Sequence, residues 1–394
     1  MPRKELAKGY TTGTCAQAAT KAALALLFRG LDLEEQGRGK EAENRVQVEL
    51  PGGSRLVFPV EDIQIERDGE RELPIQVSCA IRKDSGDDPD VTNGILIYSK
   101  VKRSEKPGIV LEGGPGVGRV TKPGLEQPVG SPAINRVPRQ MILKEAKDAC
   151  EKAGYEQGLT IQISIPEGER LAAKTFNPRL GIQGGLSVLG TSGIVEPMSE
   201  QALIDTIRLD LKVKRAGGSP YLIVAPGNYG LDFLKDTYGM DPEEAVKCSN
   251  YIGQTMDMAC ELGFQGLVLA GHIGKLIKVA GGIMNTHSKW ADCRMELLAA
   301  AALRRHLGEE KASQILESLT TEEALGICKE EERAMLGQEL VDRAEEHLIR
   351  RTEGKLELGV ILFSSQYGIL GKSSQADRLI KKYQEWHQNR QEDL

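Results

Sequence analysis

The stretch GLVLAGHIGK (266–275) decides the fold class of the C-terminal half, because a short apolar run ends in glycine and polar residues just before a helical pattern begins. Two comparable apolar runs lie on either side, in PYLIVAPGNYG (220–230) and LELGVILFSS (356–365). Short apolar strands that alternate with helices are typical of a parallel sheet covered by helices on both faces. The second half of the chain is therefore expected to form a three-layer, Rossmann-like α/β domain.

LSVLGTSGIVEPMS (186–199) is predicted to add a further strand to this sheet, over 186–190, before a helix that starts near Pro197. Open α/β sheets bind ligands at the carboxyl edge of their strands. Glycine-containing strand ends that meet there would line a nucleotide-like pocket, although ordinary turns use glycine as well. The residues expected in this pocket are Gly190, Thr191, Ser192, Gly193, Gly227, Asn228, Gly230 and Gly271.

The N-terminal part has a different order of elements, in which strand-like runs are grouped between two helical patterns. Such grouping indicates an α+β domain rather than strict alternation of strand and helix. We therefore predict two domains, an α+β domain over 1–170 and an α/β domain over 171–394. The N-terminal pattern consists of helices over 15–28 and 138–154 and strands over 46–50, 55–60, 75–83, 95–102 and 159–166.

Composition and charge exclude several classes of protein. The chain has 51 Lys+Arg against 57 Asp+Glu, a formal net charge of -6, and only 4% aromatic residues, whereas nucleic-acid binders usually carry a basic excess. The most apolar stretch, 266–284, is interrupted by charged residues, and no signal-peptide cleavage site follows the basic N-terminus. We expect a cytoplasmic protein that binds neither nucleic acid nor membranes.

The acidic turn KDSGDDPDVTNG (83–94) gathers carboxylates that could act as a base or hold a metal, although turns favour Asp and Gly in any case. Its spacing is not that of an EF-hand. His272 and His287 lack convergent ligands, and the seven cysteines include no CxxC pair, so we predict reduced thiols and no metal site. The candidates for moving a proton are Asp84, Asp88 and His272.

Five cations lie beside Pro, Gly and Asn in two segments, 120–142 and 171–185. In an acidic protein they suit a polycarboxylated or phosphorylated ligand, and scattered surface charge is an equally good explanation. Three threonine hydroxyls precede or open the first predicted helix and suit its N-terminus. The residues assigned to substrate binding are Thr11, Thr12, Thr14, Lys122, Arg136, Arg139, Lys174 and Arg179.

The glycine-rich loop VLEGGPGVGRV (110–120) is similar to nucleotide-binding loops, but Pro123-Gly124 follows where a helix should begin. A tight turn between strands is the favoured interpretation. One alternative function is a small-metabolite kinase that uses GYTTGTCAQAA (9–19) and GGPGVG (113–118) as phosphate loops. Another is an RNA-binding module, which the net charge of -6 disfavours.

Six long segments, in order, resemble the CbiD family of cobalt-precorrin-5B C1-methyltransferases, with Ser85 and Asn93 where the family commonly has Ala and His. The segments are GYTTGTCAQAATKAA (9–23), KDSGDDPDVTNG (83–94), GVGRVTKPGL (116–125), GSPAINRVPRQMI (130–142), GGLSVLGTSGIVEPMS (184–199) and the stretch 248–292.

The resemblance implies S-adenosylmethionine as methyl donor and a cobalt-containing, ring-contracted tetrapyrrole of anaerobic cobalamin biosynthesis as acceptor, with cobalt-precorrin-6A as product. Cobalt would arrive with the substrate, so the resemblance implies no metal site in the protein. The acetates and propionates of the macrocycle would suit the five loop cations, and the nucleoside of the donor would suit the glycine-lined strand ends. Homo-oligomerisation and contact with neighbouring enzymes of the pathway stay open.

Overall fold

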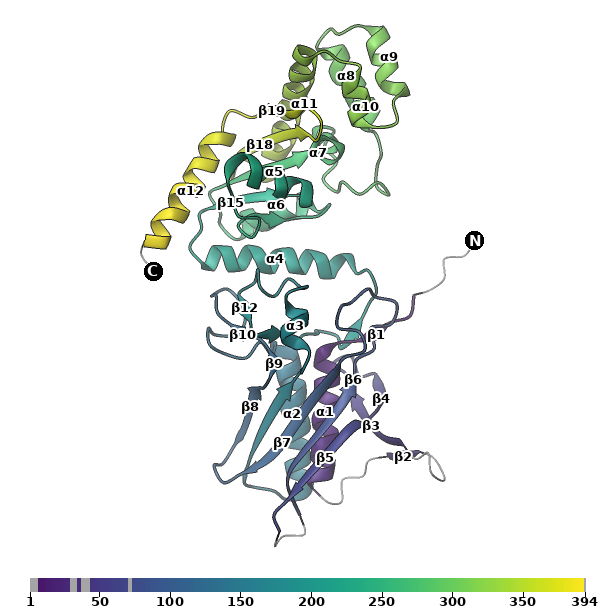
Figure 1. Ribbon diagram of the computed structural model, residues 1–394, viewed down its shortest axis with the longest axis vertical. Helices are drawn as coiled ribbons and strands as arrows, with labels where there is room; N and C mark the ends of the chain where they lie inside the picture. Colours follow the sequence, from purple (N-terminus) through teal and green to yellow (C-terminus); the bar gives the residue numbers. More distant parts are fainter. Residues whose placement is uncertain (1–5, 29–33, 37–42, 70–72, 393–394) are drawn as a thin grey trace. The chain divides into compact units, whose positions relative to one another are not determined.

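The computed structural model describes residues 6–28, 34–36, 43–69 and 73–392, and its chain divides into two units, Met1–Glu200 and Gln201–Leu394 (Figure 1). The prediction of a mixed α and β chain is confirmed. The division falls later than the expected boundary at 170, because three strands beyond that point pair with earlier ones. β12 (Ile182–Gln183) pairs with β10 (Arg119–Val120), β13 (Gly185–Leu186) with β9 (Gly116–Val117), and β14 (Ile194–Val195) with β1 (Gly9–Tyr10).

The main sheet of the N-terminal unit has five strands, whose order is β5-β6-β7-β11-β8. All neighbours are antiparallel except β11 and β8. Helices α1 and α2 pack together, and α1 lies against β6 and β7. The bounds are β5 Glu61–Arg67, β6 Pro74–Arg82, β7 Leu96–Ser104, β8 Ile109–Gly113, β11 Gly158–Ser164, α1 Thr12–Leu27, α2 Arg136–Ala153 and α3 Gly168–Ala172, with a small sheet of β2 Glu34–Gln36, β3 Glu43–Glu49 and β4 Arg55–Pro59.

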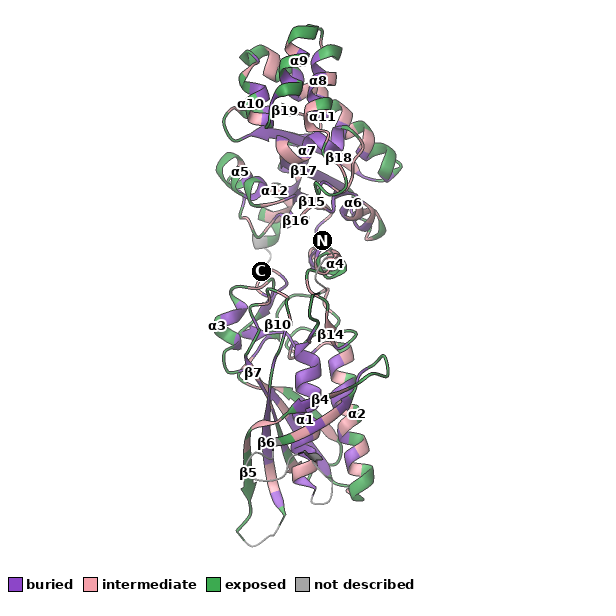
Figure 2. Cartoon of the chain, turned by 90° about the vertical axis from the view of Figure 1, so that its right-hand side faces the viewer, coloured by how far each residue is buried: buried purple, intermediate pink, exposed green. Residues whose placement is uncertain are grey.

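Helix α1 is buried along most of its length (Figure 2). Its alanines are small enough to let the helix backbone approach both the sheet and α2, and they belong to the same apolar cluster as Val77, Ile97 and Ile161. Thr11 begins the helix, because its hydroxyl accepts a hydrogen bond from the Thr14 N–H at 3.2 Å. The Ala-rich sequence therefore positions the helix N-terminus at a fixed point beside the sheet.

The sheet of the C-terminal unit has the strand order β16-β15-β17-β18-β19, with the first four strands parallel and β19 antiparallel. Apolar side chains from both faces of β15 and β17 are buried, since helices cover each side. The bounds are β15 Tyr221–Ala225, β16 Val246–Lys247, β17 Gly266–His272, β18 Glu357–Ser364, β19 Gly368–Lys372, α4 Glu200–Ala216, α5 Asn228–Tyr238, α6 Ile252–Glu261, α7 Ile273–Ala280, α8 Arg294–Arg304, α9 Glu309–Glu317, α10 Thr321–Gly326, α11 Glu330–Thr352 and α12 Ala376–Glu392.

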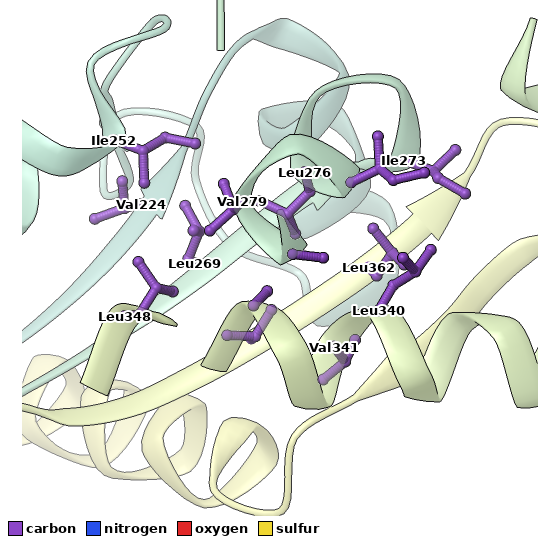
Figure 3. Close-up of a cluster of buried hydrophobic side chains, with 14 of the residues drawn as sticks. Val224, Ile252, Leu269, Ile273, Leu276, Val279, Leu340, Val341, Leu348 and Leu362 are labelled. Carbon is purple, nitrogen blue, oxygen red and sulfur yellow. The ribbon is translucent and has the colours of Figure 1, made fainter. Parts of the chain in front are cut away.

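One face of this sheet carries the larger core, in which Val224 and Leu269 meet side chains of α6, α7 and α11 (Figure 3). The opposite face packs Ile223, Val268 and Ile361 against α5 and α12. Burial of both faces explains why these strands read as continuous apolar runs rather than as alternating ones.

The strand order creates a switch point between β15 and β17. The chain passes from β15 to β16 on one side and then to β17 on the other, so the connections leave in opposite directions. In sheets of this order, ligands bind in the crevice outside the carboxyl ends of the two strands at the reversal. The ends of β15 and β17 are therefore the first place to look for a site in this unit.

Two predicted elements are wrong. LSVLG (186–190) is not a strand of the C-terminal sheet, because its beginning pairs with β9 and its end contacts α1. The stretch DPEEAVKCSNYIGQTMDMACELG (241–263) predicts a single helix, but Val246 and Lys247 form edge strand β16 and only Ile252–Glu261 is helical within it. Strands β5 and β19 are present in the structure but were not predicted from the apolar pattern.

All seven cysteines are free thiols. Burial raises the pKa of Cys15, Cys79 and Cys248 to about 12, so these three stay protonated and act as small core side chains. Among the described residues, no helix combines the length and the apolar character that crossing a bilayer requires.

Candidate functional site

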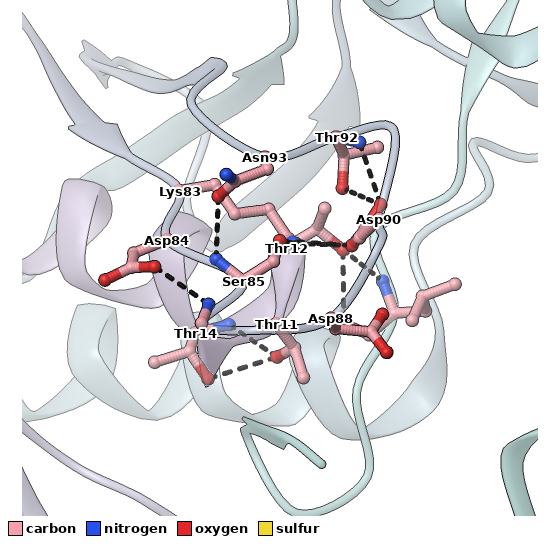
Figure 4. Close-up of polar contacts among 12 residues, drawn as sticks. Thr11, Thr12, Thr14, Lys83, Asp84, Ser85, Asp88, Asp90, Thr92 and Asn93 are labelled. Carbon is pink, nitrogen blue, oxygen red and sulfur yellow. Dashed lines mark hydrogen bonds and ion pairs between the residues drawn. The ribbon is translucent and has the colours of Figure 1, made fainter. Parts of the chain in front are cut away.

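The acidic loop 83–94 of the N-terminal unit is organised around a buried lysine (Figure 4). Lys83 is 2% exposed, and its Nζ lies 2.6 Å from Asp90 Oδ2. The Thr92 N–H and hydroxyl donate to Asp90 Oδ1 at 2.8 and 2.6 Å. Burial of the Asp90 carboxyl favours its neutral form, but the hydrogen bonds from Lys83 and Thr92 outweigh this and lower its pKa. The pair therefore holds the loop in one conformation.

The other carboxylates of this loop bind backbone N–H groups. Asp84 Oδ1 accepts from the Gly86 N–H at 2.8 Å, and Asp88 Oδ1 accepts from the Met198 N–H at 2.9 Å. Among the residues that the structure describes, no group of three or more His, Cys, Asp or Glu side chains is arranged to hold a metal. The structure brings Asp84 and Asp88 to one loop, whereas His272 belongs to the C-terminal unit.

The three threonines of the first helix are buried and bonded to segment 187–193. The Thr12 hydroxyl accepts from the Leu189 N–H at 2.9 Å, and the Thr14 hydroxyl donates to the Gly193 carbonyl at 2.7 Å. The Gly13 N–H donates to the Leu189 carbonyl at 3.0 Å. Other parts of the chain thus cover the N-terminus of α1, and the threonine hydroxyls already have protein partners.

This arrangement corrects the predicted pocket. Gly190, Thr191, Ser192 and Gly193 do not follow a strand of the C-terminal sheet, because their segment bonds to the start of α1 within the N-terminal unit. Gly190 has φ +136°, and a Cβ there would lie 2.2 Å from the Thr11 hydroxyl, so close packing explains this glycine without a ligand.

The kinase alternative is not supported. Its first phosphate loop has the Gly13 and Thr14 N–H groups bonded within the protein. In the second, the Gly114 N–H donates to the Ile163 carbonyl at 2.7 Å and the Gly118 N–H to the Leu186 carbonyl at 2.8 Å. The second loop is a turn between β8 and β9, as the breaker residues predicted, and these N–H groups are not available for phosphate.

The five cations predicted to meet an anionic ligand all lie in the N-terminal unit. Pairing of β10 with β12 brings the segments of Lys122 and Arg179 side by side. Arg136 and Arg139 belong to the first turn of α2, whose Pro138 packs against Gly13 of α1. Lys174 follows α3, which lies with β10 and β12 at one end of this unit (Figure 1).

The residues predicted at the ends of β15 and β17 do come together at the switch point. Gly227 precedes α5 and Asn228 begins it. Gly271 is the penultimate residue of β17, just before α7. A Cβ at Gly230 would lie 2.8 Å from the Ala225 Cβ and 3.0 Å from the Ala270 carbonyl oxygen, so glycine lets α5 approach both strands. Asn228 Oδ1 accepts a hydrogen bond from Lys247 Nζ at 2.7 Å.

His272 is held between a helix N-terminus and a carboxylate. Its Nδ1 accepts from the Gly274 N–H at 3.1 Å, so a neutral ring carries its proton on Nε2, 2.9 Å from Glu322 Oε1. The Ser365 N–H then donates to Glu322 Oε1 at 3.1 Å, since Nε2 has no free lone pair in that tautomer. Both ring nitrogens of His272 are therefore engaged within the protein.

An aromatic cluster surrounds this histidine. Tyr229 is 71% exposed, and its ring centroid lies 5.8 Å from that of His272. The rings of Phe363 and His272 meet edge to face with centroids 5.6 Å apart, and Phe233 stacks on Phe363 with centroids 4.2 Å apart. The sequence analysis missed Tyr229 and Glu322. Tyr229 adjoins the predicted Asn228, whereas no local signal connects His272 to a glutamate 50 residues away.

The comparisons with known proteins agree on one family. Residues 1–197 match the CbiD family model, and residues 285–374 match the model for the CbiD C-terminal domain. A cobalt-precorrin-5B C(1)-methyltransferase from Alkaliphilus metalliredigens (strain QYMF) is 45% identical over 378 residues, 96% of this chain and 95% of that protein. The protein of the same name from Ruminiclostridium cellulolyticum is 45% identical over 362 residues, covering 92% of this chain and 90% of that protein.

Among solved structures, a cobalamin biosynthesis protein (cbiD) from Archaeoglobus fulgidus matches with 27% identity and a TM-score of 0.36, covering 70% of this chain and 80% of that chain. The sequence matches extend over nearly the whole length of both partners. The chain belongs to the CbiD family.

Proposed function

We propose that this chain transfers a methyl group from S-adenosylmethionine to C1 of cobalt-precorrin-5B and yields cobalt-precorrin-6A in anaerobic cobalamin biosynthesis. The observation that carries the proposal is the 45% identity, over 96% of the chain, to a relative named cobalt-precorrin-5B C(1)-methyltransferase. Cobalt belongs to the acceptor, so the reaction needs no metal site in the protein.

In this proposal the donor binds at the carboxyl ends of β15 and β17, in a Rossmann-like arrangement. The reversal of strand order there and the convergence of Gly227, Asn228, Gly230 and Gly271 support this site. The exposed ring of Tyr229 offers a flat face for the purine of the donor. The proposed donor site does not include Gly190, Thr191, Ser192 and Gly193, whose segment bonds to the start of α1.

We assign recognition of the acceptor's carboxylates to the cations of the N-terminal unit. Guanidinium and ammonium groups form charge-assisted hydrogen bonds with acetates and propionates. The threonines at the start of α1 do not belong to the proposed acceptor site, since their hydroxyls already bond within the protein. The proposed acceptor cations are Lys122, Arg136, Arg139, Lys174 and Arg179.

Methyl transfer to carbon proceeds when the ring carbon attacks the methyl in line with its bond to sulfur, and the bond electrons leave with the sulfur as the thioether. No protein nucleophile is needed, so most of the acceleration is expected from positioning of the two reactants. Where a proton leaves the macrocycle, Asp84 is the base we propose, because it is exposed, whereas both ring nitrogens of His272 are engaged.

Ligand-dependent thermal stability tests the reaction class. S-adenosylmethionine should raise the unfolding temperature of the protein in a concentration-dependent way, since a ligand that binds only the folded state stabilises it. ATP at the same concentration is the matched control and should leave the unfolding temperature unchanged. Stabilisation by ATP and not by S-adenosylmethionine would contradict the proposal and restore the kinase alternative.

A further inference from the structure

Three lysines lie near the carboxyl edge of the C-terminal sheet, and none of them forms an ion pair with a carboxylate in the described part of the chain. Lys247 is the last residue of β16, while Lys275 and Lys278 belong to α7, which follows β17 directly. Like charges that lie close together repel each other. This edge therefore carries positive charge without paired carboxylates.

Two of these ammonium groups are held by other partners, and the third is not. Lys247 Nζ donates to Asn228 Oδ1 at 2.7 Å. Lys278 is 3% exposed, and its Nζ donates to two backbone carbonyls at 3.2 and 2.8 Å. Lys275 is half-buried and makes neither a hydrogen bond nor an ion pair with any described residue. Of the three, Lys275 is therefore the one that can donate to a ligand.

The surroundings of Lys275 favour a bound anion. Burial lowers the pKa of this ammonium group, and the nearby charges of Lys247 and Lys278 lower it further. A partly buried charge next to like charges is destabilising until an opposite charge approaches it. An anion that binds Lys275 would supply this opposite charge.

The neighbours of Lys275 distinguish two sides of the switch point. Lys275 interacts electrostatically with Lys247, which places its ammonium group toward β16. His272, at the end of β17, instead contacts Phe363 of β18 and the exposed ring of Tyr229. In the sheet, β15 and β17 lie between β16 and β18. The ammonium group therefore lies toward one side of the switch point and the aromatic ring toward the other.

The two ends of S-adenosylmethionine match these two sides. Its purine is a flat ring and suits Tyr229, whereas the carboxylate at the end of its methionine chain suits an ammonium group. The sulfonium is a cation between the two ends, so it is bound farther from Lys275 than the carboxylate is. A Cβ at Gly227, which follows β15, would meet nothing within 4 Å beyond its chain neighbours, so a ligand has room at this strand end.

We propose that Lys275 is a binding residue for the carboxylate of the methyl donor. Its ammonium group donates a charge-assisted hydrogen bond to that carboxylate, and the donor lies across the ends of β15 and β17 with its purine toward Tyr229. Lys247 holds Asn228 at the start of α5 and does not itself bind the ligand. All of these residues belong to the C-terminal unit. This inference rests on the proposed function, because that function supplies the identity of the donor.

Calorimetric binding of two nucleoside thioethers tests the inference without turnover. S-adenosylhomocysteine carries the carboxylate, whereas methylthioadenosine has the same nucleoside and a thioether but no amino acid. Lys275→Met should weaken binding of the first by about ten- to hundredfold, as for loss of one hydrogen bond to a charged group, and leave binding of the second unchanged. Lys275→Gln, which keeps a polar side chain in place, should show the same selective loss.

Lys235→Met is the matched control, because it removes an exposed lysine from α5 of the same unit. It should leave the affinities for both ligands unchanged. Unchanged binding of S-adenosylhomocysteine to the Lys275 variants, or an equal loss of affinity for both ligands, would overturn the inference.

Steady-state kinetics separate a donor site from an acceptor site. Lys275→Met should raise the KM for S-adenosylmethionine and leave the KM for cobalt-precorrin-5B unchanged. A raised KM for cobalt-precorrin-5B alone would mean that Lys275 binds a carboxylate of the acceptor, and would overturn the inference.

The proposed function and this inference fail separately. A wild-type protein that forms methylated product, with Lys275→Met indistinguishable from it, would overturn the assignment of Lys275 and leave the function standing. A wild-type protein that forms no product but binds S-adenosylhomocysteine through Lys275 would overturn the proposed reaction and leave the carboxylate site in place. Absence of both product and binding would overturn both.

Discussion

Lys83 and Asp90 form an ion pair whose lysine is almost fully buried. Asp90→Asn would leave that ammonium without its counter-charge, and an uncompensated buried charge is strongly destabilising. Because the Asp90 side chain is 25% exposed, we expect a loss of about 2–3 kcal/mol in the free energy of unfolding, below the range for fully buried pairs. Urea unfolding at neutral pH measures it, with Asp87→Asn of the same loop as a control that keeps the pair intact.

The same pair predicts a pH dependence. The pKa of Asp90 is lowered in the folded protein, so its contribution to stability is fully present above the unfolded-state value of about 3.9 and is lost as the pH falls toward the folded-state value. The stability difference between wild type and Asp90→Asn should therefore shrink as the pH is lowered through about 4. Urea titrations at several pH values measure this, and a difference that grows on acidification would contradict the assignment.

Asn228 and Arg139 should affect different ligands. Asn228→Ala removes the side chain at the start of α5 and should raise the KM for S-adenosylmethionine by about tenfold, as for loss of one hydrogen-bonded contact. Arg139→Ala removes a cation from α2 and should raise the KM for the acceptor instead. Kinetics with each substrate varied in turn measure both effects. Equal effects of each variant on both substrates would contradict separate binding sites.

At the scale of the elements, α11 and β19 approach each other through glycine. A Cβ at Gly337 would lie 2.1 Å from the Leu370 carbonyl oxygen, which is backbone and cannot move aside. Alanine would gain about 1 kcal/mol in helix propensity, but the overlap would cost more, so Gly337→Ala should lower stability by about 1–3 kcal/mol net. Gly326→Ala in α10 is the control, since its Cβ would only make ordinary contact with Tyr367 at 3.4 Å. Chemical unfolding of both variants measures the difference, and equal stabilities would contradict it.

The sequence predicted strands correctly where an apolar run pairs within a sheet, and wrongly where such a run bonds to another part of the chain. The strands expected over 220–227, 266–271 and 356–365 are confirmed as β15, β17 and β18, because each is an apolar run between turn residues. LSVLG has the same local signal, yet its Leu189 carbonyl accepts from Gly13 of α1. An apolar run has the same local sequence pattern whether its carbonyls pair in a sheet or bond to the N-terminus of a helix. Sequence alone therefore could not distinguish LSVLG from a strand of the C-terminal sheet.

At the scale of the whole molecule, the two units have separate apolar cores. S-adenosylmethionine at about 100 times its dissociation constant should add about 2.7 kcal/mol to the stability of the unit that binds it. In calorimetry, the unfolding transition of the C-terminal unit is the one whose temperature Gly337→Ala lowers, and that of the N-terminal unit is the one whose temperature Asp90→Asn lowers. The donor should raise the temperature of the first transition and leave that of the second unchanged. A shift of the latter transition alone would place the donor in the N-terminal unit and contradict our assignment.

The candidate site was predictable only in part. The position of Gly227, Asn228, Gly230 and Gly271 at one edge of the sheet was predictable, because the carboxyl ends of parallel strands share one edge. The contacts of His272 with Glu322 and of Asn228 with Lys247 join residues that are distant in the chain. Such features arise from tertiary packing, and no local pattern reports them.

The central claim is the reaction itself, and one measurement tests it most directly. The protein is incubated without oxygen with cobalt-precorrin-5B and S-adenosylmethionine that carries a labelled methyl group, and the tetrapyrrole is analysed by mass spectrometry. The account predicts a single labelled methyl on the macrocycle, at C1, that depends on the protein. An unlabelled, intact macrocycle in the presence of folded protein and intact donor would contradict it.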